Sequence, residues 1–309
     1  MALQAVDDEP RLEREPAIHI RCHLPSRRCK TASKFLSFGR ARKPENQDAR
    51  RHHAPPRRER SRRGPRIHLP ECAEDPMRIE EITLVVPTRN EERNIGAFLT
   101  SLPQDLPIIV VDASEDRTPE IVMAARHPAC TLVRRPANVS EARQLGADLA
   151  TTPWLLFTDA DVELPPDYFE RLSRHSDCHA LYGPKLSRDA FRRYYLGFAF
   201  AQRIAHRLGV PAASGSNLLV RRQVLETIGG FDPELSCNED SELAWRIKRA
   251  GYRVDFDPKL RVYAPDHRRL HRGVWRKTMH SLLRCLLLYL DLIPSRWRGH
   301  DWGYWSTAR

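Results

Sequence analysis

The 309-residue sequence has no closely spaced cysteines, no long apolar run and no apolar leader. Its seven cysteines are scattered without a C-x-x-C pair, which argues against a structural zinc site and against a disulfide framework. No run of about 18 apolar residues occurs, so we expect no membrane-spanning helix. The N-terminus lacks the apolar core of a signal peptide. These absences predict a cytoplasmic protein with reduced thiols.

Residues 1–76 also lack any sustained apolar periodicity. The segment is rich in Arg and Pro, as in Pro-Pro-Arg-Arg-Glu-Arg-Ser-Arg-Arg at 55–63. Such a composition cannot bury enough apolar surface to offset the chain entropy of ordering it, so we predict a disordered extension. Dense apolar segments begin directly after Met77. This change also fits a native start at Met77, with residues 1–76 as an upstream extension of the reading frame.

The formal net charge of +11 raises the question of a nucleic-acid partner. Residues 1–76 hold 18 Lys and Arg against 11 Asp and Glu, so +7 of the charge lies there and +4 on the rest. The extension has almost no aromatic residues on which bases would stack. A solvated tail explains the charge better than specific nucleic-acid binding does.

Short apolar runs alternate with helical patterns from Met77 onward. In the first half, strands are expected at 82–87, 107–111, 131–133 and 154–157, and helices at 95–102, 119–126 and 140–150. The second half is less regular, with helices expected at 188–208, 222–228 and 239–250 and strands at 216–220, 252–256 and 260–263. The first runs are continuous, as in a parallel sheet covered on both faces. We predict an α/β domain over 77–270, with a mostly parallel central sheet and flanking helices.

Residues 271–309 are predicted to form a C-terminal amphipathic helix and a tail. The segment from Val274 to Ile293 mixes cationic residues with leucines, and Trp297, Trp302 and Trp305 follow it. This pattern suits a helix that lies in a membrane interface, at the inner face of the cell membrane. An ordinary helix packed on the domain is the alternative.

Asp159-Ala-Asp161 directly follows the predicted strand at 154–157. Two carboxylates at one strand end repel each other, and a divalent cation removes that repulsion. Mg²⁺ and Mn²⁺ take oxygen ligands, usually one or two carboxylates with substrate phosphates and water. We therefore predict a Mg²⁺ or Mn²⁺ site at Asp159 and Asp161. Surface or helix-capping aspartates are the alternative.

Two other residues lie near the same predicted sheet edge. Asp112 ends the strand at 107–111 and has the chemistry to accept a hydrogen bond from a base imide N–H. Arg143 lies in the helix at 140–150 and can form directed, charge-assisted bonds to a diphosphate or to nearby carboxylates. A helix-capping loop and a solvated helix arginine are the respective alternatives.

Glu239-Asp240 opens the predicted helix at 239–250. Carboxylates are electrostatically favoured at a helix N-terminus, so capping is one explanation. The other is catalytic, because transfer to a hydroxyl needs a base near the acceptor and Asp240 is suitably placed for it. His267, after the last predicted strand, is a further candidate metal ligand; a surface histidine is equally consistent with the sequence.

An ordered set of motifs resembles the inverting glycosyltransferase family 2, which has the GT-A (Rossmann-like) fold. The resemblance covers about Ile82 to His267, with Val86-Pro-Thr-Arg-Asn-Glu91, Val110-Val-Asp-Ala-Ser114, Ser140-Glu-Ala-Arg143, Phe157-Thr-Asp-Ala-Asp161, Gly229-Gly-Phe-Asp-Pro233, Glu239-Asp240 and Gly251-Tyr-Arg-Val254. The sequence departs from the family's usual pattern at Ala113, Asn138 and Gln144, and His267 is four residues past Tyr263, later than the family's histidine.

The resemblance implies a role for each matching residue. Those expected to bind the nucleotide sugar are Pro87, Glu91, Asp112, Arg143 and Asp159; those expected at the metal are Asp159, Asp161 and His267; those expected beside the sugar or acceptor are Gly215, Ser216, Asn217 and Glu239. Asp240 would be the catalytic base. The implied reaction moves a sugar, with inversion and with Mg²⁺ or Mn²⁺, from a nucleotide-diphosphate sugar to a hydroxyl of a glycan, lipid or cell-envelope precursor.

Three alternatives remain open from the sequence. Polyprenyl-phosphate sugar transferases share the opening motif and the Asp-Ala-Asp, but their phosphate acceptor is already anionic and needs little help from a base, so Glu239-Asp240 favours a hydroxyl. Nucleotidyltransferases would ordinarily have a Gly-rich or basic triphosphate loop, which Pro87–Asn94 is not. A non-catalytic scaffold that binds nucleic acid or membrane would have little use for Asp159, Asp161 and Asp240 together.

Overall fold

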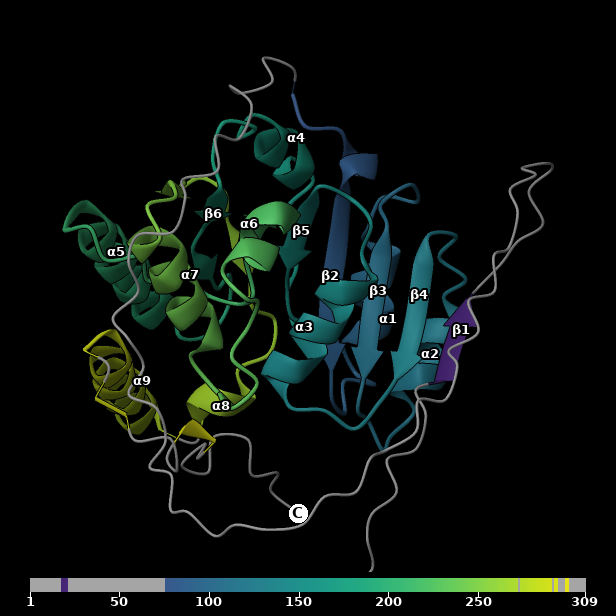
Figure 1. Cartoon of the computed structure of the whole chain (residues 1–309). Helices are drawn as coiled ribbons and strands as arrows, with labels where there is room; N and C mark the ends of the chain where they lie inside the picture. The colour runs from purple at the N-terminus through teal and green to yellow at the C-terminus, as the bar shows by residue number, and fades with distance from the viewer. Residues whose placement is uncertain (1–17, 22–75, 272, 291, 294–297, 300–309) are drawn as a thin grey trace, which may run out of the picture.

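A computed structural model describes residues 18–21, 76–271, 273–290, 292–293 and 298–299 (Figure 1). Most of the predicted extension 1–76 therefore lies outside the described residues. The chain folds around one eight-stranded sheet of order β1-β4-β3-β2-β5-β8-β6-β9. A second, two-stranded sheet pairs β7 (Lys185–Leu186) with β10 (Val262–Tyr263) in parallel.

The first half of the chain builds the parallel part of the large sheet. Its strands are β2 (Ile82–Thr88), β3 (Ile108–Asp112), β4 (Cys130–Arg134) and β5 (Trp154–Phe157), which all run in one direction. The helices between them are α1 (Ile95–Thr100), α2 (Thr118–Ala124) and α3 (Val139–Leu149). These elements confirm the predicted alternation of strands and helices, and the predicted mostly parallel sheet with flanking helices.

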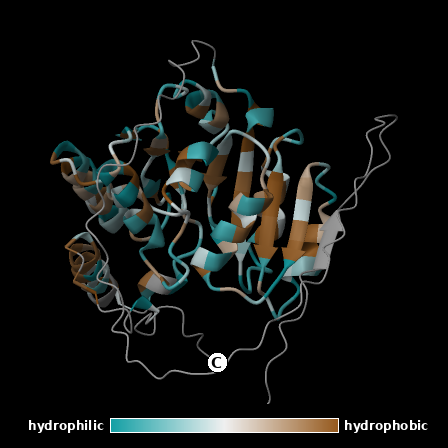
Figure 2. Ribbon diagram, viewed as in Figure 1, coloured by the Kyte–Doolittle hydropathy of each residue, from teal (hydrophilic) through white to brown (hydrophobic). Residues whose placement is uncertain are grey.

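The strands are buried on both faces, as their continuous apolar runs predict. Leu84 and Val86 of β2 belong to the cluster that packs against α1 and α2, whereas Val85 belongs to the cluster on the α3 side. Figure 2 shows the resulting hydrophobic strands in the centre of the molecule. α3 packs very close to the sheet, because a Cβ at Gly146 would lie 2.4 Å from Val85 Cγ1. A side chain at 146 would push α3, and with it Arg143, away from the sheet.

The second half extends the sheet with antiparallel pairs. β8 (Leu218–Arg221) runs antiparallel to both β5 and β6 (Ala180–Tyr182), and β9 (Val254–Phe256) is parallel to β6. The remaining helices are α4 (Tyr168–Ser173), α5 (Arg192–Arg207), α6 (Arg222–Thr227), α7 (Glu239–Arg249), α8 (Arg268–His271) and α9 (Val274–Tyr289), with the short 3₁₀ turn η1 at Ile79–Glu81. The short elements α4, β6, β7 and α8 are not anticipated from the sequence, since each is too brief to show a period.

One strand lies inside the predicted disordered extension. β1 (Ile18–Arg21) pairs antiparallel with β4 at the edge of the sheet. The unpaired backbone groups of an edge strand accept a further strand without demanding an apolar period, so hydropathy alone does not reveal β1.

No helix among the described residues is long and apolar enough to span a membrane. The four cysteines in the described part, Cys130, Cys178, Cys237 and Cys285, form no disulfide with one another.

Candidate functional site

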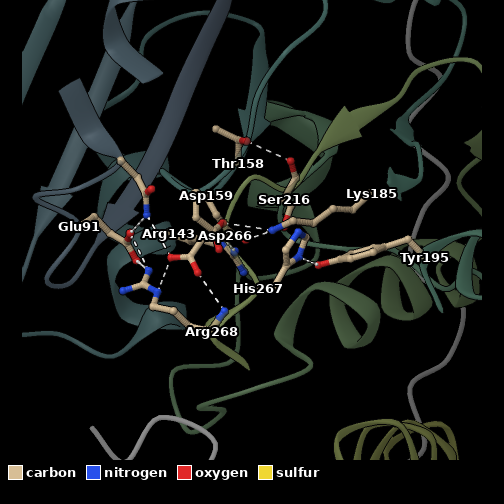
Figure 3. A network of polar contacts seen from close by, with 12 residues as sticks. Glu91, Arg143, Thr158, Asp159, Lys185, Tyr195, Ser216, Asp266, His267 and Arg268 are labelled. Atoms are coloured by element: carbon tan, nitrogen blue, oxygen red, sulfur yellow. Dashed lines mark hydrogen bonds and ion pairs between the residues drawn. The ribbon is translucent and has the colours of Figure 1, made fainter. Parts of the chain in front are cut away.

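The loops that follow β2, β3 and β5 meet at the carboxyl edge of the sheet. Thr88, the last residue of β2, is in register with Asp112, the last residue of β3, and Asp159 follows β5 two residues past its end. The N-terminus of α7 brings Glu239 and Asp240 to the same edge. Figure 3 shows Glu91 of the β2 loop and Asp159 of the β5 loop within a network of polar contacts. The predicted clustering of polar residues beyond the strand ends is therefore present.

Asp112 lies at the β3 end of this cluster and is 1% exposed. Its Oδ1 accepts hydrogen bonds from Thr88 Oγ1 at 2.8 Å and from Ser114 Oγ at 2.6 Å. Its buried Oδ2 forms an ion pair with Arg134 Nε at 3.5 Å but accepts no hydrogen bond from the described residues. A buried carboxylate oxygen without a donor is costly. An N–H group of a nucleobase would supply the missing donor. Pro87, the penultimate residue of β2, is partly buried beside this strand end.

Glu91, in the loop after β2, is held by α8. Arg268 Nη2 donates to both its carboxylate oxygens, at 2.7 and 2.8 Å, and Asn94 Nδ2 donates at 2.8 Å (Figure 3). Burial raises the pKa of Glu91, and the negative charge of Asp161 adds to the rise, whereas Asn94 and Arg268 oppose it. A hollow of about 400 Å³ opens nearby, lined by Asn90, Glu92, Arg93, Glu115, Asp116 and Arg268. Asp159 and Asp161 do not line it.

Arg143 joins the β5 loop to α7. It is 2% exposed, its Nη2 donates to Asp159 Oδ1 at 2.9 Å, and its Nη1 is hydrogen-bonded to Glu239 Oε1. Such a buried cation is stabilised by its two carboxylates. Arg143 is therefore placed to fix Asp159 and Glu239 relative to each other. Its predicted contact with a diphosphate stays a prediction.

The loop before β8 completes this arrangement. A Cβ at Gly215 would lie 2.2 Å from Arg143 Nη2, so the buried guanidinium needs glycine there. Ser216 Oγ donates to Asp159 Oδ2 at 2.5 Å. Asn217 is buried and turned away, since it accepts from Tyr168 OH at 2.6 Å and donates to Leu260 O at 2.7 Å. Gly215 and Ser216 thus shape the site, and Asn217 anchors the loop.

Asp161 is paired with a lysine. Lys185 Nζ donates to Asp161 Oδ1 at 3.1 Å and to Ser216 Oγ at 3.4 Å (Figure 3). No group of three His, Cys, Asp or Glu side chains in the described part of the chain is arranged to hold a metal. A carboxylate such as Asp161 is a ligand type that Mg²⁺ and Mn²⁺ take together with substrate phosphates, and the metal site at Asp159 and Asp161 stays a prediction.

At the start of α7, Glu239 is buried and Asp240 is partly buried. Gly215 N–H donates to Asp240 Oδ2 at 2.5 Å, and Ser241 N–H donates to Asp240 Oδ1 at 2.6 Å. Burial raises the pKa of Asp240, and nearby Arg143 opposes that rise. Burial likewise raises the pKa of Glu239 to about 7, against the lowering effect of Arg143. A carboxylate with a raised pKa is a better proton acceptor, so Asp240 has the properties of a general base.

His267 lies beside this network but is engaged elsewhere. Its Nε2 is 2.8 Å from Asp189 Oδ1, and its Nδ1 is 3.4 Å from Tyr195 OH. Phe191 packs edge-on against the ring. Both ring nitrogens therefore have protein partners, and the predicted metal role of His267 stays a prediction.

Two residues of the site are missed by the sequence reasoning. Lys185 faces Asp161 and Arg268 faces Glu91. Lys185 follows β6, a three-residue strand that gives no periodic signal, and Arg268 is one of many basic residues near the C-terminus. Lys185 directly follows Gly183-Pro184, which in turn directly follow the apolar triplet at 180–182. This order of residues is the signal that could have identified Lys185.

Comparison with known proteins agrees with this geometry. A family model described as glycosyl transferase family 2 matches residues 83–229. The pre-mycofactocin glycosyltransferase of Mycobacterium tuberculosis (strain H37Rv) is 27% identical over 220 residues, which cover 65% of this chain and 46% of that protein. The succinoglycan biosynthesis protein ExoA of Rhizobium meliloti is 29% identical over 206 residues, covering 59% of this chain and 62% of that protein. The chain thus spans about half to three-fifths of the length of these two relatives.

A further relative and a solved structure match over larger shares of their own length. An uncharacterized glycosyltransferase of Mycobacterium tuberculosis (strain H37Rv) is 36% identical over 188 residues, covering 57% of this chain and 82% of that protein. A mannosyltransferase from Pyrobaculum calidifontis, solved with GDP-Man and Mn²⁺, superposes with a TM-score of 0.53 at 25% identity, covering 75% of this chain and 76% of that chain. These matches confirm the GT-A fold, and with it that the chain belongs to glycosyltransferase family 2.

Proposed function

We propose that the protein is a metal-dependent, inverting glycosyltransferase that moves a sugar from a nucleotide-diphosphate sugar to a hydroxyl acceptor. The observation that carries this proposal is the joint placement of Asp112, Asp161 and Asp240 at one edge of the sheet. Asp112 offers a hydrogen-bond acceptor for a nucleobase, Asp161 a ligand for a cation and Asp240 a partly buried general base. The loops between them bring all three into one site.

The donor is proposed to lie along the strand ends. Asp112 and the nearby Pro87 and Glu91 would surround the nucleoside, and Asp159 would lie beside the diphosphate or the sugar. Mg²⁺ or Mn²⁺, held by Asp161 and shared with Asp159, would offset the charge that develops on the leaving diphosphate. The Pyrobaculum mannosyltransferase, solved with a nucleotide sugar and Mn²⁺, supports this donor class and this cofactor.

Asp240 is proposed to take the proton of the acceptor hydroxyl as its oxygen attacks the anomeric carbon. The Gly215 and Ser241 N–H groups orient the carboxylate. Its raised pKa favours proton uptake, and the in-line attack inverts the anomeric centre. Glu239 has a different task, since its bond to Arg143 holds the arginine against Asp159. The acceptor is proposed to be a glycan, lipid or cell-envelope precursor.

A phosphate acceptor, as in polyprenyl-phosphate sugar transfer, is the second candidate. A phosphate is already anionic and does not need a proton removed, so the well-oriented carboxylate of Asp240 would have little to do. This contrast favours the hydroxyl acceptor. Cytoplasmic location, with contact to a membrane surface and none to nucleic acid, is part of the same proposal.

The donor is tested by thermal stabilisation of the full chain with UDP-, GDP- and dTDP-sugars, with and without Mn²⁺. A ligand that binds the folded state raises the melting temperature according to its affinity and concentration. We expect one nucleotide diphosphate to stabilise the protein in the presence of Mn²⁺. No stabilisation by any of them would contradict the proposal. Loss of this stabilisation in Asp112→Ala, with an unchanged melt of the free variant, would locate the nucleoside.

A further inference from the structure

Exposed apolar side chains are concentrated on α5 and α9. Twelve of the fourteen exposed large hydrophobic side chains of the described residues lie on these helices or within three residues of their ends. On the α5 side they are Leu196, Phe198, Phe200, Ile204 and Leu208; on the α9 side they are Trp275, Met279, Leu282, Leu283, Leu286, Leu290 and Leu292. Figure 2 shows α9 as mostly hydrophobic on the outside of the molecule. Together these twelve residues form what we call the α5–α9 face.

The two helices lie side by side. Tyr194 of α5 hydrogen-bonds with Thr278 of α9, and Tyr289 OH donates to Pro211 O, just past α5, at 2.9 Å. Figure 1 shows both helices on the same side of the molecule, beyond α7. The apolar side chains of the α5–α9 face therefore belong to one region of the surface. Large groups of exposed apolar side chains on a folded domain mark binding surfaces.

The charge around the face is mainly positive. Residues 190–225 and 267–290 contain no Asp or Glu, although Asp291 stands between Leu290 and Leu292 in the sequence. The exposed cations of α5 are Arg192, Arg193, Arg203 and Arg207, and α9 adds Arg276 and Lys277 in its sequence. Apolar side chains with an excess of basic over acidic residues around them complement an anionic lipid surface. A second copy of the chain would instead bring the same positive charge against itself.

The side of α9 that faces the domain contacts the residues that flank Asp240, the candidate base. Cys285 Sγ accepts a hydrogen bond from Asn238 Nδ2 at 3.2 Å, and Arg284 Nε donates to Cys237 O at 3.4 Å. Cys285 and Tyr289 both hydrogen-bond with Ser241. Residues 237, 238 and 241 flank Glu239 and Asp240 in the chain. α9 thus contacts both sides of the segment that carries the base.

We propose that the α5–α9 face docks the protein on an anionic membrane leaflet and that α9 thereby holds Asp240 next to lipid-borne acceptors. The docking part stands on the surface itself; the acceptor part rests on the proposed function. An acceptor whose apolar tail lies in the leaflet would present its hydroxyl beside the helix that supports the base. Transfer to such an acceptor would then depend on docking, whereas donor binding at the strand ends would not.

Docking is tested by flotation of the full chain with vesicles of phosphatidylcholine, alone or mixed with phosphatidylglycerol. We expect binding to the mixed vesicles, weakening with salt, and a drop of roughly tenfold or more in the Leu282→Gln/Leu286→Gln variant. The matched control is Met123→Gln/Leu149→Gln, which changes the two exposed hydrophobics that lie away from the face, and its binding should equal that of the wild type. Equal binding by both variants, or no binding by the wild type, would overturn the proposal.

A measurement on the wild-type protein tests docking even if the double variant does not fold. Trp275 is 81% exposed, so brominated lipids should quench part of the wild-type tryptophan fluorescence, and Trp275→Phe should lose that part. Sedimentation without lipid distinguishes a self-association surface: a concentration-dependent dimer that Leu282→Gln/Leu286→Gln abolishes, with no vesicle binding, would refute a membrane role.

The acceptor part has its own readout. The Leu282→Gln/Leu286→Gln variant should lose most transfer to a lipid-linked acceptor in vesicles while keeping the thermal stabilisation by nucleotide diphosphate and Mn²⁺. If nucleotide diphosphate and Mn²⁺ do not stabilise the wild type, that result counts against the proposed donor and leaves the docking proposal unaffected. Unchanged transfer by an undocked variant would refute the coupling between the leaflet and Asp240.

Discussion

Gly215→Ala tests the central claim that a buried guanidinium fixes the spacing of the site. The added methyl would lie 2.2 to 2.4 Å from three atoms of the Arg143 guanidinium. The end of an arginine ordinarily moves aside at small cost. Here it is 2% exposed and is bonded to Asp159 and Glu239, so moving it breaks buried ion pairs. Moving the Gly215 loop instead would withdraw the N–H that orients Asp240.

The size of the effect follows from these two routes. Overpacking alone costs about 1–3 kcal/mol. Separating a buried cation from its carboxylates costs about 3–5 kcal/mol. We expect Gly215→Ala to lower the free energy of unfolding by about 3 kcal/mol, because the protein adopts whichever of the two rearrangements costs less. At about 2–4 °C per kcal/mol for a domain of this size, the melting temperature should fall by roughly 6–12 °C. Transfer activity should fall as well.

The assay is a double-mutant cycle by denaturant unfolding, with wild type, Gly215→Ala, Arg143→Ala and the double variant. Without the guanidinium the methyl at 215 has room, so Gly215→Ala should cost less than about 1 kcal/mol in the Arg143→Ala background. The coupling energy between the two positions should then be about 2 kcal/mol. Additive effects would refute the reasoning. Gly197, which has no neighbour within 4 Å of a built Cβ, provides the control Gly197→Ala.

Three further predictions concern charge at the site. Asp240→Asn should abolish transfer to a hydroxyl while nucleotide diphosphate with Mn²⁺ still stabilises the protein; retained transfer in a rate assay would contradict the role of the base. The pKa of Glu239 in the folded state, about 7, is higher than its ordinary value of 4.5. The folded state therefore binds an extra proton between these two pH values, and the free energy of unfolding falls as the pH rises through that range. Glu239→Gln should therefore flatten the pH dependence of the melting temperature. Lys185→Met removes the cation paired with Asp161, and we expect tighter Mn²⁺ binding by isothermal titration with nucleotide diphosphate present; weaker binding would show that Lys185 supports the metal instead.

The sequence predicted the central sheet well because its signals are local. Continuous apolar runs gave β2, β3, β4 and β5 within a few residues, and the strand ends located Asp112 and Asp159. The second half was harder, since β6 has three residues and β7 has two. β1 pairs through its backbone at a sheet edge, which hydropathy does not record.

The partners of the site residues lay beyond the reach of the sequence. Arg143 and Glu239 are 96 positions apart, and Glu91 and Arg268 are 177 apart. Motif order showed that these residues belong together, but only the folded chain shows Arg143 facing two carboxylates and Lys185 facing Asp161. Long-range ion pairs carry no periodicity, so charge type alone could not assign them.

The position of Arg143 also bears on how substrates enter and leave. A hinge that separated the β5 loop from α7 would break at least one of the two ion pairs that Arg143, on α3, makes with them. The Arg268 bridge to Glu91 is less protected, because the Arg268 side chain is half exposed. Exchange of donor and product is therefore expected to proceed by loosening of α8 over the β2–α1 loop, while the carboxylates around Arg143 keep their spacing through every turnover.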